Sequence, residues 1–110
     1  MRRQGWRIGF LGAGYIADWH WKALRGIKGV QVVAVCDREV GRARSFAERF
    51  GVPASFGVLE EMLAASKLDA VHVLLPPDLH FGPAQQLLDA GIHIYLEKPA
   101  CINVADCEKL

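Results

Sequence analysis

The chain has 110 residues, of which 52% are hydrophobic, and this suits one ordinary domain with a single core. Its 13 Lys and Arg residues nearly balance 12 Asp and Glu residues, so the net charge of +1 argues against nucleic acid or an anionic membrane as a partner. No apolar run approaches the roughly 18 to 20 residues that span a bilayer, and we therefore expect a soluble protein.

The cysteines indicate the compartment. Cys36, Cys101 and Cys107 are odd in number and lack Cys-x-x-Cys spacing, which argues against a disulfide framework and a zinc site. These features favour a reducing cytoplasm. No group of Cys, His and carboxylate residues has metal-ligand spacing, so we expect no metal.

The first predicted unit is a strand, a tight turn and a helix within "RIGFLGAGYIADWHWKAL", residues 7 to 24. Arg2 and Arg3 before this apolar run imitate a secretory signal, but three glycines within six positions suit a buried strand that ends in a tight turn. Helical spacing predicts one packed face on the helix, formed by Ile16, His20, Ala23, Leu24 and Ile27.

The middle of the chain predicts two strands and two helices. Residues 30 to 37, "VQVVAVCD", form an apolar, β-branched run that is typical of a parallel strand covered on both faces. A helix capped by Gly51 follows. Its packed face is predicted to be Val40, Ala43, Ala47 and Phe50. Residues 54 to 56 suit a short third strand, and the next short helix is marked by Leu59, Met62 and Leu63.

The last part of the chain predicts two more strands. Residues 69 to 75 form one, which stops at Pro76 and Pro77 because proline cannot donate to a sheet. A helix follows and closes at Gly91. Its apolar face is predicted to be His80, Ala84, Leu87 and Leu88. Residues 92 to 96 form the fifth strand, and Asn103 is a helix N-cap.

Strands that alternate with helices predict right-handed crossovers and a parallel sheet covered on both faces. The fold class is therefore α/β, with a doubly wound sheet of Rossmann type. A six-stranded sheet of this kind needs one strand more than the sequence provides, so we expect the last strand to be lacking.

The glycines after the first strand match a dinucleotide fingerprint. Gly12, Gly14 and Ala17 fit G-x-G-x-x-A: Gly12 allows the tight turn, Gly14 lets a pyrophosphate approach the backbone, and Ala17 keeps helix and strand close. The pattern alone is weak, because small residues at such a turn also serve packing. Its context, between a predicted strand and a predicted helix, strengthens it.

Asp37 stands at the end of the second strand, 23 residues beyond Gly14, where a carboxylate can accept hydrogen bonds from the adenosine ribose. Its alternative role is to cap the following helix. A carboxylate there repels a 2′-phosphate, which favours NAD over NADP. Arginines nearby could instead pair with that phosphate; a solvated helix face is the simpler interpretation for Arg42 and Arg44, whereas Arg38 could stack on adenine.

The stretches "GFLGAGYIADWHWKAL", "VCDRE", "LLPPDLH" and "EKP", in this order and spacing, resemble the N-terminal domain of the glucose-fructose oxidoreductase and inositol dehydrogenase family, the Gfo/Idh/MocA group. The resemblance covers essentially the whole chain. It implies an NAD(P)-dependent oxidoreductase acting on sugars, cyclic polyols and related compounds, with a second, mostly antiparallel α/β domain completing the pocket. The sequence has no counterpart to that domain, so we expect residues 1–110 to be the NAD(P)-binding domain as a fragment that is inactive alone.

The resemblance assigns catalysis to Lys98 of "EKP", whose ammonium would orient a hydroxyl or stabilise the oxygen that becomes a carbonyl. Without the resemblance, a surface lysine at a strand end is the preferred interpretation. The positions expected to contact the cofactor are Gly12, Gly14, Tyr15, Ile16, Asp37, Arg38, Leu75, Pro76, Pro77, His80, Glu97 and Lys98.

Three of the residues in these motifs also have specific structural interpretations. Leu75 stands where the family often has Thr or Asn, so a side-chain hydrogen bond is lost there. His80 matches the family pattern but sits on an apolar helix face, where packing is the preferred role. His20, with Trp19 and Trp21 beside it, is expected to face inward and to be structural.

The leading hypothesis is the NAD-binding half of an oxidoreductase that moves hydride between nicotinamide and a CH–OH group of a sugar-like or polyol small-molecule substrate. A non-enzymatic dinucleotide-binding or sensing module would keep Gly12, Gly14 and Asp37 but would not need Lys98. An S-adenosylmethionine methyltransferase shares the glycine loop and the acid but not "LLPPDLH" or "EKP". The sequence leaves the substrate and the oligomeric state open, a homo-oligomer included.

Overall fold

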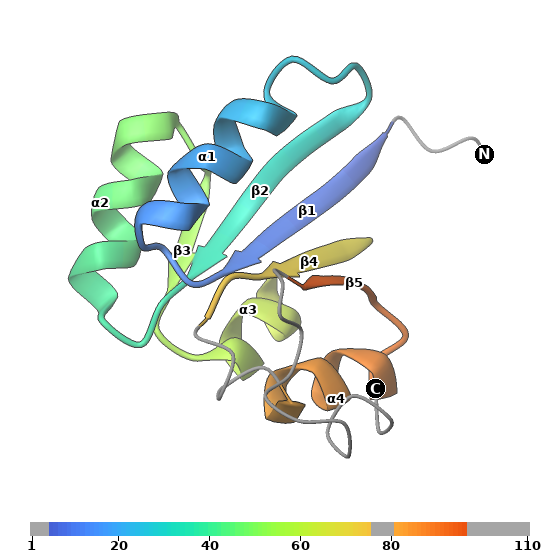
Figure 1. Ribbon diagram of the computed structural model, residues 1–110. Helices are drawn as coiled ribbons and strands as arrows, with labels where there is room; N and C mark the ends of the chain where they lie inside the picture. Colours follow the sequence, from blue (N-terminus) through green and yellow to red (C-terminus); the bar gives the residue numbers. More distant parts are fainter. Residues whose placement is uncertain (1–4, 76–80, 97–110) are drawn as a thin grey trace.

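The computed structural model describes residues 5–75 and 81–96. These residues form a five-stranded parallel sheet flanked by helices (Figure 1). The strand order is β3-β2-β1-β4-β5, which confirms the predicted doubly wound α/β fold of Rossmann type. In chain order the elements are β1 Trp6–Leu11, α1 Tyr15–Leu24, β2 Val30–Cys36, α2 Val40–Phe50, β3 Ala54–Phe56, α3 Leu59–Ala65, β4 Ala70–Val73, α4 Phe81–Asp89 and β5 His93–Leu96.

Helices cover the sheet from both sides (Figure 1). Helices α1 and α2 lie on one face, and α3 and α4 lie on the other. Each side has its own core, because successive side chains of a strand point to opposite faces. The core under α1 and α2 contains Phe10, Ala17, Val35 and Phe46. The core on the α3 and α4 side contains Leu11, Met62, Val71 and Leu87.

The predicted packed face of the first helix is partly wrong. Helix α1 ends at Leu24, so Ile27 falls in the following turn and is 49% exposed. Ile16 is 41% exposed, and Ala23 is exposed as well. The prediction from residue spacing therefore extended the packed face beyond the end of the helix and included residues on its solvent-exposed side.

Helix α1 instead packs through a small residue. Ala17 is fully buried, and its methyl group lets the helix backbone lie close to the sheet. Trp21, one turn further on, is partly buried and stacks on Phe50 of α2 with ring centroids 4.4 Å apart. Across the same two helices, Arg49 donates to both carboxylate oxygens of Asp18, at 2.8 and 3.3 Å. These contacts fix α1 against α2.

Helix α2 ends where predicted, but its packed face differs from the prediction. Gly51 has φ of 70°, a left-handed conformation that favours glycine and ends the helix. Ala43 is buried as expected, whereas Val40 is 47% exposed. The residue that the prediction missed is Phe46, which is fully buried and lies 5.8 Å from Phe10 between ring centroids.

The predicted packed face of α4 is partly right. Leu87 is fully buried, whereas Leu88, also predicted to be packed, is 44% exposed.

No helix in the described part of the chain is long and apolar enough to cross a membrane.

We expect Phe46→Ala to lower the free energy of unfolding by about 3 to 5 kcal/mol, because it leaves a cavity beneath α2. Ile27→Ala is the matched control, since its sequence spacing predicted burial and the structure exposes it. Its cost should stay below about 1 kcal/mol. Urea denaturation followed by circular dichroism measures both, and equal costs for the two variants would contradict the packing described here.

Candidate functional site

The strand order reverses at β1, and we call the region at the carboxyl ends of β1 and β4, where this happens, the crevice. From β1 the chain proceeds outward to β2 and β3, and it then crosses to β4 and β5 on the other side of β1. In open α/β sheets, ligands bind outside the carboxyl ends of the strands where the order reverses in this way. Here that point lies between the loop after β1, residues 12–14, and the residues after β4, Leu74 and Leu75.

Gly12 packs against the residues after β4 too closely to carry a side chain. Its φ is +109°, and a Cβ atom there would lie 2.8 Å from the Leu74 carbonyl oxygen and 3.4 Å from Leu75 Cδ2. The Gly12 amide donates to the Cys36 carbonyl at 2.7 Å, and the Leu74 amide donates to the Leu11 carbonyl at 2.8 Å. The backbone therefore holds the two sides of the crevice together, with Leu75 directly beside the glycine loop.

Gly14 has the opposite surroundings. It is the N-cap of α1, with φ of −83°, and apart from its chain neighbours no atom lies within 4 Å of a Cβ atom built there. The fold itself therefore tolerates a side chain at this position. An open approach to the N-terminus of a helix is the environment that a phosphate group requires.

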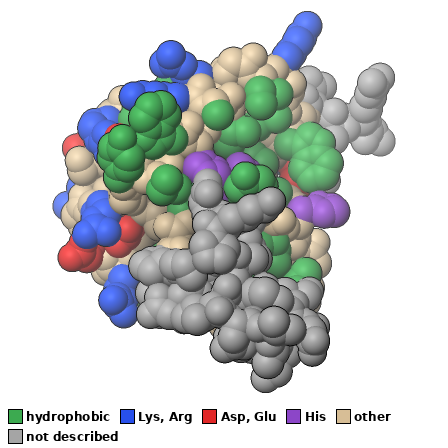
Figure 2. Space-filling model, in the orientation of Figure 1, with side chains coloured by type: hydrophobic (Ala, Val, Ile, Leu, Met, Phe, Trp, Pro, Cys, Tyr) green, Lys and Arg blue, Asp and Glu red, His purple; other side chains and the backbone are tan. Residues whose placement is uncertain are grey.

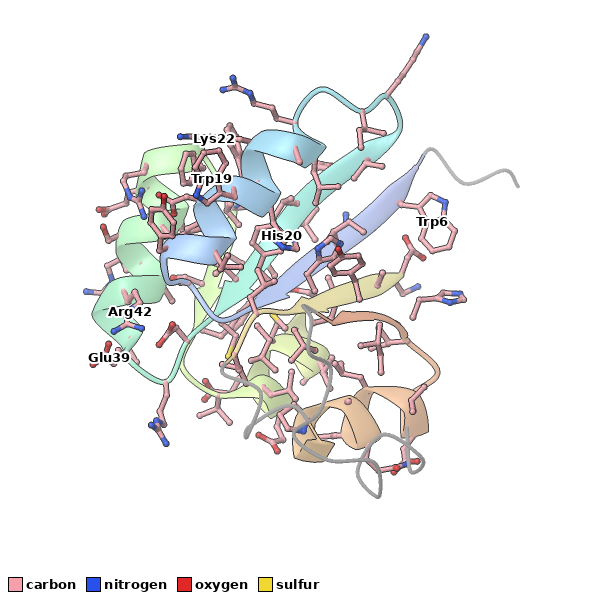
Figure 3. All side chains as sticks on the ribbon, viewed as in Figure 1. Trp6, Trp19, His20, Lys22, Glu39 and Arg42 are labelled. Carbon is pink, nitrogen blue, oxygen red and sulfur yellow. The ribbon has the colours of Figure 1, made fainter. Side chains whose placement is uncertain are left out.

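The first turn of α1 is exposed beside this opening. Tyr15 is 75% exposed, and its ring meets that of Trp19 edge-on with centroids 6.1 Å apart. Figure 3 shows Trp19 and Lys22 on the outer side of α1, where the Lys22 ammonium lies 5.7 Å from the centre of the Trp19 ring. Ile16, exposed in the same turn, also borders the glycine loop. Tyr15 and Ile16 are therefore exposed directly after the glycine loop.

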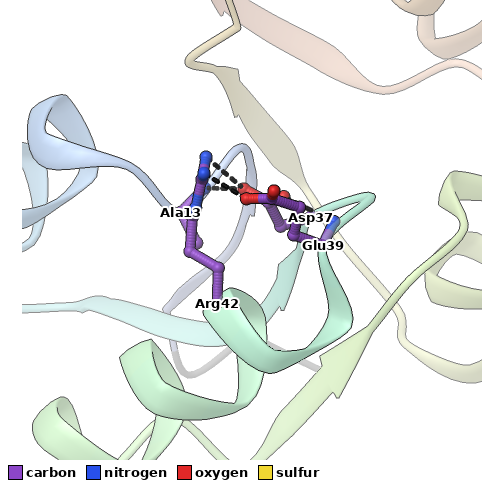
Figure 4. Close-up of polar contacts among 4 residues, drawn as sticks. All are labelled: Ala13, Asp37, Glu39 and Arg42. Atoms are coloured by element: carbon purple, nitrogen blue, oxygen red, sulfur yellow. Dashed lines mark hydrogen bonds and ion pairs between the residues drawn. The ribbon is translucent and has the colours of Figure 1, made fainter.

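Asp37 ties β2 to the glycine loop (Figure 4). Its Oδ2 atom accepts a hydrogen bond from the Ala13 amide at 2.9 Å, and its Oδ1 atom accepts one from the Glu39 amide at 2.8 Å. The carboxylate is buried. The bond to Glu39 is not a helix cap, because Glu39 itself is the N-cap of α2 and that cap has no side-chain hydrogen bond. The capping alternative for Asp37 is therefore wrong, and the bond to Ala13 was not predicted from the sequence. Asp37 therefore orders the glycine loop and the residues that lead into α2.

The arginines near Asp37 differ in their contacts. Arg38 and Arg44 are exposed. Arg42 was expected on a solvated helix face, and it is half-exposed, but its guanidinium turns back toward two carboxylates (Figures 3 and 4). Nη2 contacts Glu39 Oε2, and Nη1 lies 3.7 Å from Asp37 Oδ2.

A histidine pair connects α1 to β4. His20, expected to be inward-facing and structural, is partly buried and points toward the sheet (Figure 3). Its Nδ1 atom lies 2.9 Å from Nδ1 of His72, and the Tyr95 ring stacks on His72 with centroids 4.8 Å apart. Figure 2 shows histidine side chains gathered in the middle of this face, with hydrophobic side chains around them. The pair joins the two elements that carry the loops of the crevice.

The remaining predicted site residues, Pro76, Pro77, His80, Glu97 and Lys98, lie outside the residues that the structure describes. Within the described ranges, no three His, Cys, Asp or Glu side chains are grouped closely enough to hold a metal ion.

A glycine turn at a helix N-terminus, a buried acid at the end of the next strand and a crevice at the reversal of strand order define a dinucleotide-binding α/β domain. Residues 6–110 match the oxidoreductase family with an NAD-binding Rossmann fold, Gfo/Idh/MocA. The chain belongs to this family, and the resemblance noted in the sequence is confirmed.

Individual relatives agree with this assignment. The chain is 35% identical over 105 residues to an uncharacterized oxidoreductase, ORF334, of Rhizobium meliloti, covering 94% of this chain and 31% of the relative. It is 31% identical over 104 residues to the scyllo-inositol 2-dehydrogenase (NADP(+)) IolU of Bacillus subtilis, covering 94% of this chain and 32% of that protein. The chain thus spans about a third of the length of these relatives.

A solved structure supports the same conclusion. The WlbA dehydrogenase of Bordetella pertussis, in complex with NADH and UDP-GlcNAcA, superposes with a TM-score of 0.89 at 28% identity. The match covers 96% of this chain and 32% of that one. The chain is therefore a domain of the oxidoreductase family with the NAD-binding Rossmann fold that the sequence predicted.

We expect Asp37→Ala to destabilise the chain in the absence of any cofactor. The variant leaves the buried Ala13 amide without its acceptor, which costs about 1 to 3 kcal/mol of unfolding free energy. Glu48→Ala, at an exposed position of α2, is the control and should change this free energy by less than about 0.5 kcal/mol. Urea denaturation compares them, and a fully stable Asp37→Ala chain would contradict the ordering role of the carboxylate.

Cys36, the last residue of β2, carries a thiol that resists ionisation. Burial, reinforced by the negative charges of Asp37, Glu60 and Glu61, raises its pKa to about 11. An unfolded thiol ionises near pH 8.5, so this group contributes stability below that pH and loses the contribution as the pH rises toward 11.

We therefore expect the free energy of unfolding of the wild type to fall more steeply than that of Cys36→Ala between about pH 8.5 and about pH 11. Urea titrations at several pH values measure the two slopes. Parallel slopes would show that the native environment does not suppress ionisation of this thiol.

Proposed function

We propose that this chain forms the cofactor-binding part of an oxidoreductase that transfers hydride between nicotinamide and a CH–OH group of a sugar, cyclic polyol or related small molecule. In such enzymes the cofactor supplies the redox chemistry, and the protein supplies binding, orientation and electrostatics. The cysteine pattern, odd in number and without Cys-x-x-Cys spacing, supports a reducing cytoplasm as its location.

The open space at Gly14 is the observation that carries this proposal. Position 12 requires glycine because the protein backbone occupies the place of a side chain there. At position 14 no neighbouring atom of the protein excludes a side chain, so packing does not explain the glycine. An approaching pyrophosphate supplies the missing reason, since it needs the loop amides and the positive end of α1. The adenosine ribose then extends toward Asp37, whose carboxylate can accept hydrogen bonds from the ribose hydroxyls.

The substrate class rests on the relatives. They include the Bacillus subtilis scyllo-inositol 2-dehydrogenase and an inositol 2-dehydrogenase of Salmonella typhimurium, which is 27% identical over 106 residues. We assign the catalytic role to Lys98, whose ammonium would hold the substrate hydroxyl and stabilise the oxygen that becomes a carbonyl. Tyr15, Ile16 and Leu75 border the nicotinamide half of the crevice in this proposal.

We expect Gly14→Val to fold normally and to lose NAD binding, because the branched side chain would occupy the approach of the pyrophosphate. Gly12→Ala is the contrasting variant, because its methyl group would clash with the Leu74 carbonyl oxygen. It should lower the unfolding temperature in addition to weakening NAD binding. Calorimetric titration with NAD measures binding, and circular dichroism measures folding and thermal unfolding.

The two outcomes are separable. A folded Gly14→Val chain that binds NAD as tightly as the wild type would overturn the proposed position of the pyrophosphate. A wild-type chain that binds no dinucleotide would overturn the proposed function as a whole.

A further inference from the structure

We propose that Glu39, the N-cap of α2, and Arg42 in the first turn of this helix set the preference between NAD and NADP. Arg42 is the residue positioned to bind a 2′-phosphate, and Glu39 competes with that phosphate for the guanidinium. This inference rests on the proposed function, because it requires the adenosine ribose to lie at Asp37. From the sequence, a solvated helix face was the preferred interpretation for Arg42, and no role was assigned to Glu39.

The Arg42 guanidinium lies close to the Asp37 carboxylate, where the ribose is expected. Asp37 Oδ2 accepts the hydrogen bond from the loop amide of Ala13 at 2.9 Å, and the same oxygen lies 3.7 Å from Arg42 Nη1. One carboxylate oxygen therefore lies next to both the glycine loop and the guanidinium (Figure 4). Because the ribose is expected at this carboxylate, a phosphate on its 2′ oxygen is within reach of Arg42.

The Arg42 guanidinium already has a partner of opposite charge. Arg42 Nη2 contacts Glu39 Oε2, three residues earlier on the chain. The Arg42 and Glu39 side chains are 51% and 65% exposed, so both can exchange partners without unpacking the core. A guanidinium binds phosphate and carboxylate through the same pairs of N–H groups, and the two anions therefore exclude each other.

The balance of charge around a 2′-phosphate would be unfavourable here. The phosphate would meet Asp37 and Glu39, two carboxylates, with Arg42 as the neighbouring cation already paired to one of them. Replacing Glu39 by glutamine removes one repulsive charge and releases Nη2 for the phosphate. Asp37 remains, so the preference for NAD should narrow rather than invert.

The other arginines of α2 lack this position. Arg44 follows Arg42 by two residues on α2, which turns its side chain by about 200° around the helix. In the described residues, the remaining ion pair of α2 joins Arg49 to Asp18 of α1. Arg42 is therefore the guanidinium of α2 that the structure places beside Asp37.

The test compares the dissociation constants for NAD and NADP, measured by calorimetric titration at low ionic strength on the full 110-residue chain. In Glu39→Gln we expect the ratio Kd(NADP)/Kd(NAD) to fall about tenfold, the size of one charge-assisted interaction. In Glu39→Gln combined with Arg42→Gln, the ratio should return to the wild-type value or rise above it.

Two controls define the cause. Glu48→Gln removes a carboxylate from an exposed position further along α2 and should leave the ratio unchanged. Because the Glu39 and Arg42 side chains are exposed, the tenfold change should shrink when salt is raised to about 0.5 M. Circular dichroism verifies that each variant is folded, and Glu39→Ala provides a second way to remove the charge.

The outcomes decide the question. A ratio in Glu39→Gln and Glu39→Ala within twofold of the wild type would overturn the inference, as would a gain in NADP binding that persists without Arg42. Both results leave NAD binding, and hence the proposed function, intact. A wild-type chain that binds neither dinucleotide overturns the proposed function and this inference together.

Discussion

The absence of room at Gly12 is the constraint on which the rest of the site depends. The Leu74 carbonyl would lie 2.8 Å from a Cβ atom at Gly12, so the loop after β1 and the backbone after β4 touch where the strand order reverses. The next glycine, Gly14, is then turned toward solvent at the start of α1. A tight internal contact and an open approach, two residues apart, make the crevice suitable for a dinucleotide.

Asp37 supplies the second fixed point, and it does so with both oxygens. One accepts the Ala13 amide and the other the Glu39 amide, so a single buried side chain connects the glycine loop to the start of α2. In the proposed function this carboxylate also accepts hydrogen bonds from the ribose, so one side chain would order the loop and bind the cofactor. The bond between His20 and His72 reinforces the arrangement by holding α1 to β4.

The sequence predicted the succession of elements well, because local periodicity and turn residues decide them: the apolar run of β2 and the cap at Gly51 are clear without a structure. It predicted the packed face of α1 poorly, since spacing alone does not reveal that Ala17 is the point of closest approach. The positions of Asp37 and of the glycines were predictable from their motif. The bond from Ala13 to Asp37 and the turn of Arg42 toward Asp37 and Glu39 were not, because they depend on how β1, β2 and α2 lie in space.

The double attachment of Asp37 also limits how this protein can diverge. A substitution at Asp37 leaves two backbone amides, those of Ala13 and Glu39, without their acceptor. A variant with a changed ligand preference would therefore also have a less stable fold. The start of α2 lacks this constraint, because the Glu39 and Arg42 side chains there are 65% and 51% exposed. Evolutionary change in ligand choice is therefore expected to accumulate along that helix while the acid at the end of β2 stays in place.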